Sequence, residues 1–315
     1  MPEVRSPTLR RRELGALLRS RRLELGLTVE QVAERLMISP SKVSRMETGQ
    51  RGATQRDVRD LCTLYGITDE AERDRLMTLA REGKQQGWWQ PYALPYATFI
   101  GLEQAATSIK IYHSAVVPGV LQTADYTRAV HRAAIPRLAD EVIEERVEER
   151  STRQQLLTGE HSPLVDVMLD EAVLHRPVGG RSVMRDQLDQ IISASDYPNV
   201  AVQILPYDIG AHPALESDFT ILGFESKARS IVYVEGLVGQ IYVERQQEVE
   251  RYQEVFERLH GIALGPKDSN TLLRKIRETY ANGLAGRQTF ANGPRGSSTT
   301  ADEWARCPLL GTEGE

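Results

Sequence analysis

The sequence predicts a multidomain protein: an all-α helix-turn-helix head of five helices, followed by an α+β carboxy-terminal domain with a mainly antiparallel sheet. Three observations predict this architecture. The chain has 315 residues, which is too long for one small domain. Apolar residues recur at helical spacing over about the first eighty positions, and short runs typical of strands follow later. We expect a head at 8–82, a linker at 83–97, an α+β domain at 98–284 and a disordered tail at 285–315.

Composition favours a soluble, cytoplasmic protein. Hydrophobic residues make up 40% of the chain and charged residues 26%, and there is neither a run of about 18 apolar residues nor a charged-then-apolar leader. The two cysteines, Cys62 and Cys307, lie far apart without CxxC or Cys/His spacing. We therefore expect no disulfide framework, no metal site, no other cofactor and no membrane contact.

Charge is distributed unevenly along the chain. Residues 1–66 hold 13 Arg or Lys and 8 Asp or Glu, a balance of +5, which leaves −10 for the rest of a chain whose net charge is −5. A basic head on an acidic body is expected when one domain contacts a polyanion and the other does not.

Two helices are predicted at the start of the head. The first runs from Thr8 to Glu24, where leucines recur at helical spacing, and Gly26 ends it. Thr28 and Gln31 have the three-residue spacing of a capping box, which predicts the start of a second, short helix.

The third predicted helix has two distinct faces. Ser39 can cap it, Pro40 can occupy its first position, where the missing N–H costs nothing, and Gly49 ends it. Successive side chains point about 100° apart around the helix axis, so the sequence sorts them by direction. The inward face holds Val43, Met46 and Glu47, and the outward face holds Ser41, Ser44, Arg45 and Thr48, with Lys42 at the margin.

This outward face suits the major groove of DNA. Short hydroxyls contact phosphates, and Arg or Lys reaches the acceptors of guanine. Helices at about 54–65 and 69–81 complete the head. Spacing alone also fits a plain helical packing module with a solvated polar face, and that alternative stays open at this point.

The segment RSRRLELGLTVEQVAERLMISPSKVSRMETGQRG, residues 19–52, resembles the helix-turn-helix of XRE-type (Cro-like) repressors, with SxxxxSRxExG in its recognition helix. The resemblance covers residues 9–66 and implies DNA binding. It also implies that Arg22, late in the first helix, pairs with Glu47, late in the recognition helix.

The same resemblance assigns DNA contacts position by position. It makes Gln31 a phosphate or support contact at the start of the second helix, and Ser44 a phosphate contact. Arg51 and Arg56 follow the recognition helix, where they could meet the DNA backbone. The base-edge candidates are Ser41, Lys42 and Arg45.

After the linker, in which Trp88 and Trp89 are expected to dock the head on the body, the pattern becomes mixed. Helices are predicted at 101–108, from a Thr123 cap to 133, and at 138–157, 181–193, 246–264 and 268–281, with an apolar stretch at 109–117. The predicted strands are LVDVMLDEAVL, VAVQILPY, DFTILGFE and SIVYVEGLVGQIYVE. Because several strands are neighbours in sequence, an antiparallel sheet is favoured over a doubly wound one.

Several segments of this region resemble the carboxy-terminal domain of WhiJ-like regulators, which are actinobacterial proteins with an XRE-type head. The resemblance implies a transcriptional regulator of development or secondary metabolism, sometimes described as antitoxin-like, whose gene often lies beside one for a small partner protein. The segments are FIGLEQAATSIKIYHSAVVPGVLQTADYTRAV, the RxxxRxxRQ at 146–154, DEAVLHRPVGG, ILPYDIGAH and IVYVEGLVGQIYV.

Three arginines of the 138–157 helix form a candidate partner-binding site. Arg146, Arg150 and Arg153 are spaced i, i+4 and i+7, so they share one helix face. This stripe could receive an acidic partner or ligand, or it could pair with acids inside the domain.

Catalysis is not predicted. His175 lies near two acids and His212 follows a glycine-containing loop, but the chain lacks HExxH, GxSxG and paired-cysteine motifs. The expected protein is a cytoplasmic, sequence-specific regulator that binds double-stranded DNA as a homodimer and senses a partner or effector through its second domain. The alternative is an antitoxin-like interaction protein that binds a small partner protein and uses DNA binding for autoregulation.

Overall fold

The computed structural model describes residues 6–92, 94–134, 137–225 and 230–281. The described residues all belong to one compact unit, Met1–Ala281. The tail predicted at 285–315 lies outside them.

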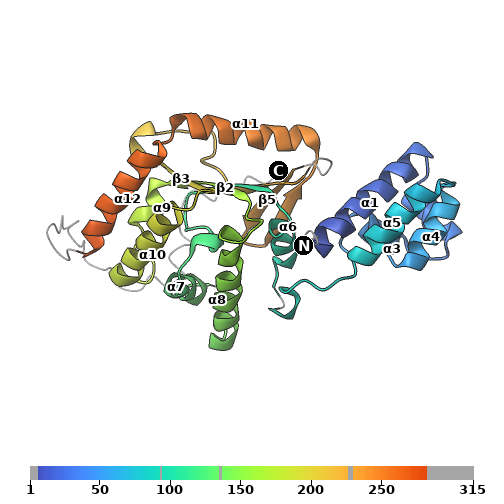
Figure 1. Cartoon of the computed structure of the whole chain (residues 1–315), viewed down its shortest axis with the longest axis horizontal. Helices are drawn as coiled ribbons and strands as arrows, with labels where there is room; N and C mark the ends of the chain where they lie inside the picture. Colours follow the sequence, from blue (N-terminus) through green and yellow to red (C-terminus); the bar gives the residue numbers. More distant parts are fainter. Residues whose placement is uncertain (1–5, 93, 135–136, 226–229, 282–315) are drawn as a thin grey trace, which may run out of the picture. The chain divides into compact units, whose positions relative to one another are not determined.

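The head contains the five predicted helices, α1 (Pro7–Glu24), α2 (Val29–Arg35), α3 (Pro40–Glu47), α4 (Gln55–Leu64) and α5 (Glu70–Glu82) (Figure 1). Polar side chains cap four of them. Thr28 and Thr54 each form a capping box, and Ser39 and Asp69 each accept a hydrogen bond from the first turn. These caps satisfy N–H groups that a helix leaves free, so the helix starts are set by local sequence.

The head has its own hydrophobic core, to which all five helices contribute. Leu14, Val32, Val43, Leu61 and Leu76, one from each helix, are at most 3% exposed. The packing joins α1 to α3 and α5, and α2 to α3. Helix α3 is therefore supported by neighbours on its inner side.

The carboxy-terminal region is α+β, as predicted, around a six-stranded mixed sheet of order β3-β2-β1-β4-β5-β6. The strands are β1 (Ser108–His113), β2 (Leu164–Asp170), β3 (Val200–Leu205), β4 (Phe219–Gly223), β5 (Ile231–Gly236) and β6 (Gly239–Val243). The ladders β1–β4, β4–β5 and β5–β6 are antiparallel, whereas β1–β2 and β2–β3 are parallel. The parallel ladders follow from the helices between these strands, because a parallel pair needs a long crossover.

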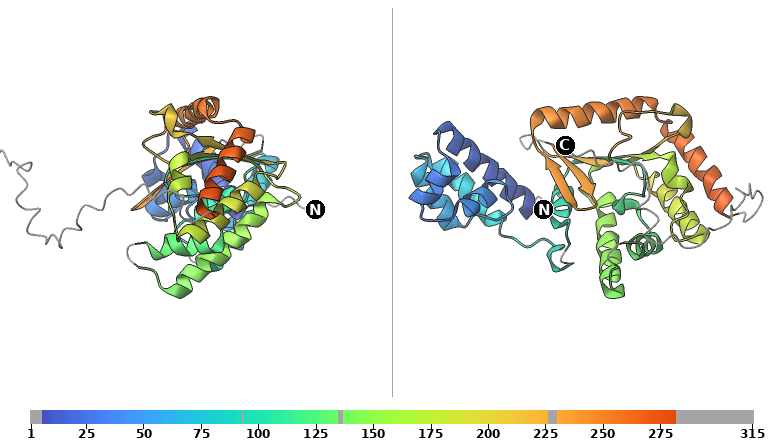
Figure 2. Two further views of the ribbon diagram at one scale, coloured as in Figure 1. Left: turned by 90° about the vertical axis from the view of Figure 1, so that its left-hand side faces the viewer. Right: turned by 180° about the vertical axis from the view of Figure 1, so that it is seen from behind.

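Two layers of helices cover the sheet (Figures 1 and 2). One face packs against α6 (Ala97–Glu103), α7 (Ala124–Arg132), α9 (Glu171–His175), α10 (Arg181–Ala194) and α12 (Pro266–Ala281). Helix α8 (Asp140–Gln154) packs on α7. Helix α11 (Gln246–Ile262) covers the other face. Side chains alternate along β1, so Ile109 and Ile111 enter the first core and Tyr112 the second. Short 3-10 turns lie at Gln90–Tyr92, Gly119–Leu121, Gln155–Leu157 and Tyr207–Ile209.

Two element predictions need correction. The run LVDVMLDEAVL is a strand only as far as Asp170, whose carboxylate accepts a hydrogen bond from the Ala172 N–H and starts α9. A short apolar run does not separate strand from buried helix, which is why the sequence misled here. The helix predicted at 101–108 lies earlier, at Ala97–Glu103, and Ser108 already begins β1.

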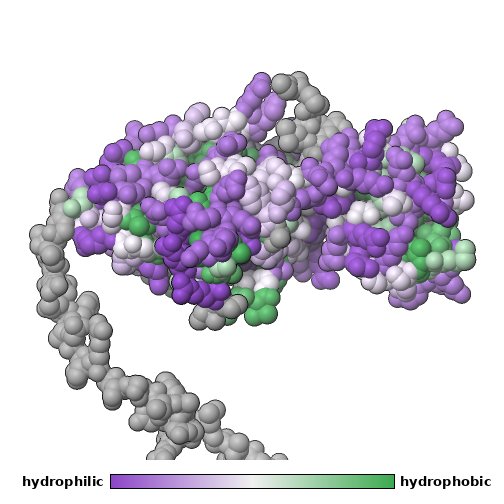
Figure 3. Space-filling model, turned by 90° about the horizontal axis from the view of Figure 1, so that it is seen from below, coloured by the Kyte–Doolittle hydropathy of each residue, from purple (hydrophilic) through white to green (hydrophobic). Residues whose placement is uncertain are grey.

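The face shown in Figure 3 is largely hydrophilic, with hydrophobic residues in small patches. This distribution is expected when apolar side chains are collected in buried cores, of which the described residues form three clusters.

Candidate nucleic-acid interface

Helix α3 has the two faces that its sequence predicts. Val43, Met46 and Glu47 are buried, whereas Ser41, Ser44 and Arg45 are exposed. The Ser39 hydroxyl caps the helix by accepting a hydrogen bond from the Lys42 N–H at 3.2 Å. The exposed face offers hydroxyls and a guanidinium, the groups that contact phosphates and guanine.

A buried ion pair holds the inner side of α3. Arg22 donates from Nε to Glu47 Oε1 at 2.6 Å and from Nη2 to Oε2 at 2.8 Å, and the two residues are 7% and 8% exposed. Arg22 also donates to the Leu27 carbonyl at 2.8 Å. The hydrogen bonds to Glu47 raise the pKa of Arg22. This bidentate pair joins the end of α1, the following turn and the end of α3.

Two glycines let the neighbouring segments approach α3 closely. A Cβ at Gly15 of α1 would lie 2.5 Å from the carbonyl oxygens of Met46 and Glu47. Gly49, which follows α3 with a φ of +70°, would place a Cβ 2.8 Å from the Arg12 Cα. The sequence predicts Gly49 as a helix stop, but the packing role of Gly15 is not predictable from it, because a lone glycine within a helical run carries little information about packing.

Arg45 is the exposed cation best placed for base contact. Its Nε donates to the Ser41 carbonyl of its own helix at 3.2 Å, and no salt bridge to it is formed within the part of the chain that the structure describes. A guanidinium that is not committed to an acid can turn both Nη groups toward a DNA base.

Lys42 is held inside the head. Its Nζ lies 2.6 Å from Asp57 Oδ1, and Asp57 also closes the capping box of α4 with Thr54. Lys42 therefore ties α3 to α4, and a base contact would require it to leave Asp57.

Gln31 and Arg51 lie on either side of α3 in sequence, and both are exposed. The Gln31 carboxamide oxygen accepts a hydrogen bond from the Thr28 N–H at 2.9 Å and so completes the capping box of α2. The Arg51 N–H donates to the Arg45 carbonyl at 3.0 Å, so the chain after Gly49 folds back on the end of α3.

The turn between α2 and α3 contains a residue in the left-handed region. Met37 has a φ of +51° and is 93% exposed. The next residue, Ile38, donates its N–H to the Ala33 carbonyl at 2.9 Å, which fixes the reversal of the chain. The backbone of a residue other than glycine is strained in this conformation.

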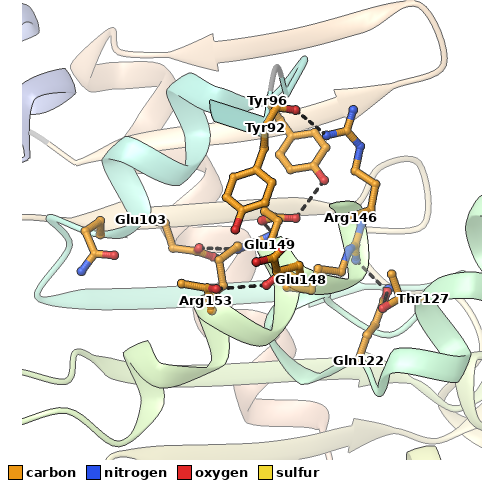
Figure 4. Close-up of polar contacts among 12 residues, drawn as sticks. Tyr92, Tyr96, Glu103, Gln122, Thr127, Arg146, Glu148, Glu149 and Arg153 are labelled. Carbon is orange, nitrogen blue, oxygen red and sulfur yellow. Dashed lines mark hydrogen bonds and ion pairs between the residues drawn. The ribbon is translucent and has the colours of Figure 1, made fainter. Parts of the chain in front are cut away.

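The second candidate site, the arginine stripe of α8, faces the interior of its domain (Figure 4). Arg153 is 6% exposed and makes a bidentate pair with Glu103 at 2.7 and 2.8 Å, and its Nη1 lies 3.2 Å from Glu149. Glu149 also accepts a hydrogen bond from the Tyr96 hydroxyl at 3.1 Å. Burial alone would lower the pKa of Arg153, but Glu103 and Glu149 outweigh it and raise that pKa.

The other two arginines also use internal partners. Arg146, 8% exposed, donates to the Tyr92 carbonyl at 3.2 Å, and Arg150 donates to the Gln122 carboxamide oxygen at 2.6 Å. Arg146 and Arg153 are therefore buried on internal partners, a backbone carbonyl for Arg146 and two acids for Arg153. Binding of an acidic partner by the stripe stays a prediction. Glu149, one i, i+4 step before Arg153, was the internal partner expected from sequence, whereas Glu103, the other acid paired with Arg153, was not singled out.

Two family models match the chain, one in each region. A family model described as a domain of unknown function (DUF5753) matches residues 96–275, more than half of the 315-residue chain. The chain belongs to this family. A second model, described as a helix-turn-helix domain, matches residues 13–76. Curated proteins and solved structures gave no match.

The DUF5753 match includes all six strands of the sheet, and the helix-turn-helix match includes α2 and α3. The protein is thus a helix-turn-helix DNA-binding regulator with a DUF5753 domain. Its membership of the WhiJ-like group, and of the XRE type, stays a prediction from the quoted residues.

The histidines of the DUF5753 domain singled out from sequence lie beside acids. His175 Nε2 is 3.0 Å from Glu171, and His212 Nε2 is 3.7 Å from Asp170. Within the described ranges no group of three or more His, Cys, Asp or Glu side chains could hold a metal ion. In the same part of the chain, no helix is both long and apolar enough to cross a membrane.

Proposed function

We propose that this protein is a sequence-specific transcriptional regulator that reads the major groove with α3. The observation that carries the proposal is the division of α3 into an exposed face with Ser41, Ser44 and Arg45, and a buried face anchored by Glu47. The helix-turn-helix match over residues 13–76 supports it.

The chemistry of the exposed face suits base reading. The Arg45 guanidinium can donate two parallel hydrogen bonds to guanine O6 and N7, and the serine hydroxyls can donate to phosphates. The ion pair between Arg22 and Glu47 fixes α3 before DNA arrives, so less freedom is lost on binding.

The proposal extends to the whole chain. A homodimer would place two recognition helices about 34 Å apart, on successive turns of the DNA major groove. The DUF5753 domain would sense an effector or partner and change operator affinity, in the control of development or secondary metabolism that the WhiJ-like resemblance implies.

The decisive experiment is a gel-shift series with Arg45→Ala, using an operator selected from a pool of random DNA. We expect the variant to lose about 1–3 kcal/mol of binding free energy and to relax its preference at one base position. Arg56→Ala is the control, because the exposed Arg56 lies 3.7 Å from Asp60 and follows the recognition helix. Any loss of affinity in Arg56→Ala should be the same for all DNA sequences. Unchanged affinity and preference in Arg45→Ala would overturn the proposal.

The antitoxin-like alternative makes a different prediction. It requires a stable stoichiometric complex with a small protein encoded nearby, and loss of a toxic activity on binding. Co-expression and co-purification with the neighbouring gene product would detect such a complex, whereas a regulator acting through DNA alone would purify without it.

A further inference from the structure

An open cleft of about 400 Å³ lies between α11 and the loop that precedes β4. Its apolar wall consists of Phe219 at the start of β4, Val243 at the end of β6, and Tyr252 and Val255 of α11. The Phe219 and Tyr252 rings meet edge to face with centroids 5.0 Å apart. This volume and lining fit a small molecule, because ligand pockets measure about 300–1,000 Å³ and are mainly apolar with a few polar groups.

Acidic side chains predominate among the charged groups of the cleft. Glu216 comes from the loop and Glu248 from the first turn of α11, and the lining holds one cation, Arg251. Two carboxylates next to two aromatic rings favour a positive group, because carboxylates pair with it and ring faces attract it. Glu248 is shared with Arg245, whose Nη1 lies 3.4 Å from it, whereas Glu216 forms no salt bridge among the residues that the structure describes. An anion would therefore be repelled chiefly by Glu216.

The loop that carries Glu216 is fixed at both ends and exposed between them. Asp218 accepts hydrogen bonds from the Ser114 N–H at 2.9 Å and from its hydroxyl at 2.7 Å. At the other end His212 is 9% exposed and accepts from the Ala214 N–H at 3.3 Å. Between them, Leu215 is 59% exposed and offers apolar surface beside the cleft.

The cleft also adjoins a contact with the DNA-binding head. Val243 lines the cleft, and its two chain neighbours both engage Arg12 of α1: Glu244 pairs with the guanidinium, and Tyr242 has it 4.7 Å from its ring centroid. Arg12 in turn lies against Gly49, two residues after the last residue of α3. Movement of the β6–α11 junction would therefore reach the recognition helix through one arginine.

We propose that this cleft binds a small organic cation, an amine on an aromatic or apolar body, and that binding changes DNA affinity through Glu244 and Arg12. The proposal rests on the proposed function for its DNA readout alone. Glu216 and Glu248 hold the ammonium group, and Phe219 and Tyr252 hold the ring. The ligand acts because it contacts α11 and the loop together and so favours one position of the β6–α11 junction.

The first test measures binding by the full chain without DNA, by calorimetry with three probes that share an indole ring. Tryptamine carries an ammonium, tryptophol a hydroxyl and indole-3-propionate a carboxylate. We expect tryptamine to bind in the millimolar range or tighter, and at least about tenfold more tightly than indole-3-propionate. Absence of saturable tryptamine binding, or equal affinity for the acid, would overturn the proposal.

Matched variants locate the binding site. Glu248→Gln and Glu216→Gln should each weaken tryptamine several-fold and leave tryptophol unchanged, so the second probe reports that the fold is intact. Glu250→Gln is the control, because Glu250 lies on the same helix, accepts from Gln246 at 2.8 Å and does not line the cleft. If the first two variants bind tryptamine as wild type does, the ammonium is held elsewhere and the assignment fails.

The second test measures operator affinity with and without tryptamine. Wild type should change its affinity at least about threefold, and Glu244→Gln should keep wild-type tryptamine binding while its operator affinity no longer responds. A bound probe with no effect on wild-type operator affinity would refute the coupling. If the protein binds no operator at all, the proposed function fails, whereas the calorimetric result on the cleft still stands or falls by itself.

Discussion

At the scale of single residues, an acid on a DNA-reading helix is explained by where it points. Glu47 lies in the head core, paired with Arg22, while Arg45 two residues earlier is exposed. The same helical turn therefore carries one charge that fixes the helix and another, exposed, that we propose reads a base. Because the acid is neutralised internally, it adds little repulsion toward phosphate.

Removing Glu47 should affect stability more than recognition. Glu47→Ala leaves the Arg22 guanidinium buried without its carboxylate, which we expect to cost about 3–5 kcal/mol of unfolding free energy. Urea unfolding of the full chain measures the loss, and operator selection measures base preference. A double variant, Arg22→Met with Glu47→Leu, removes both charges and should regain most of the stability. A changed base preference with an unaltered unfolding curve would contradict the assignment.

Relief of backbone strain at Met37, in the turn between α2 and α3, should raise the stability of the protein. Met37 has a φ of +51° and is 93% exposed, so Met37→Gly removes backbone strain and sacrifices little burial. We expect a gain of about 0.5–1 kcal/mol, reduced by the greater freedom of glycine in the unfolded chain. Leu25→Gly is the control, because Leu25 has a φ of −84° and gains no relief. Loss of stability in both variants alike would show that Met37 is not strained.

At the scale of elements, features encoded by neighbouring residues were predictable and features made by distant ones were not. Capping pairs such as Thr28 with Gln31 predicted helix starts to within a residue or two. The helical spacing of Val43, Met46 and Glu47 predicted the buried face of α3. The parallel ladders of β1, β2 and β3 depend on which way the intervening helices cross, which strand patterns do not encode. For the same reason the stripe on α8 could not be assigned from sequence, because Glu103 lies fifty positions from Arg153.

His131 of α7, which packs near Arg150 and Arg146 of α8, makes the free energy of unfolding depend on pH. Burial, with the charges of Arg150 and Arg146, lowers the pKa of His131 from 6.5 to about 4. Between these values the unfolded chain binds more protons than the folded one, so stability falls as pH falls from 6.5 toward 4. His131→Gln should flatten this part of the profile, measured as urea midpoint against pH. Parallel profiles for wild type and His131→Gln would contradict the prediction.

At the scale of the whole molecule, one head presents one short recognition helix, α3, of eight residues. A single helix of this kind contacts only a few bases, which gives limited affinity and specificity. The rest of the chain also repels DNA phosphates, since residues 1–66 carry a net charge of +5 and the remainder carries −10. Two heads on one operator would therefore gain much more than one, which is the physical reason for proposing a homodimer.

The spacing of half-sites tests that arrangement. If two α3 helices bind one face of the DNA, the operator should contain half-sites about 10 base pairs apart, in inverted order. Inserting about 5 base pairs between them turns one half-site to the opposite face, and we expect affinity to fall about a hundredfold because only one head can then bind. Inserting about 10 base pairs restores the face and should recover part of the loss in a gel shift. An operator affinity that is indifferent to both insertions would show that each chain binds DNA alone, and sedimentation of the complex would then give one chain per site.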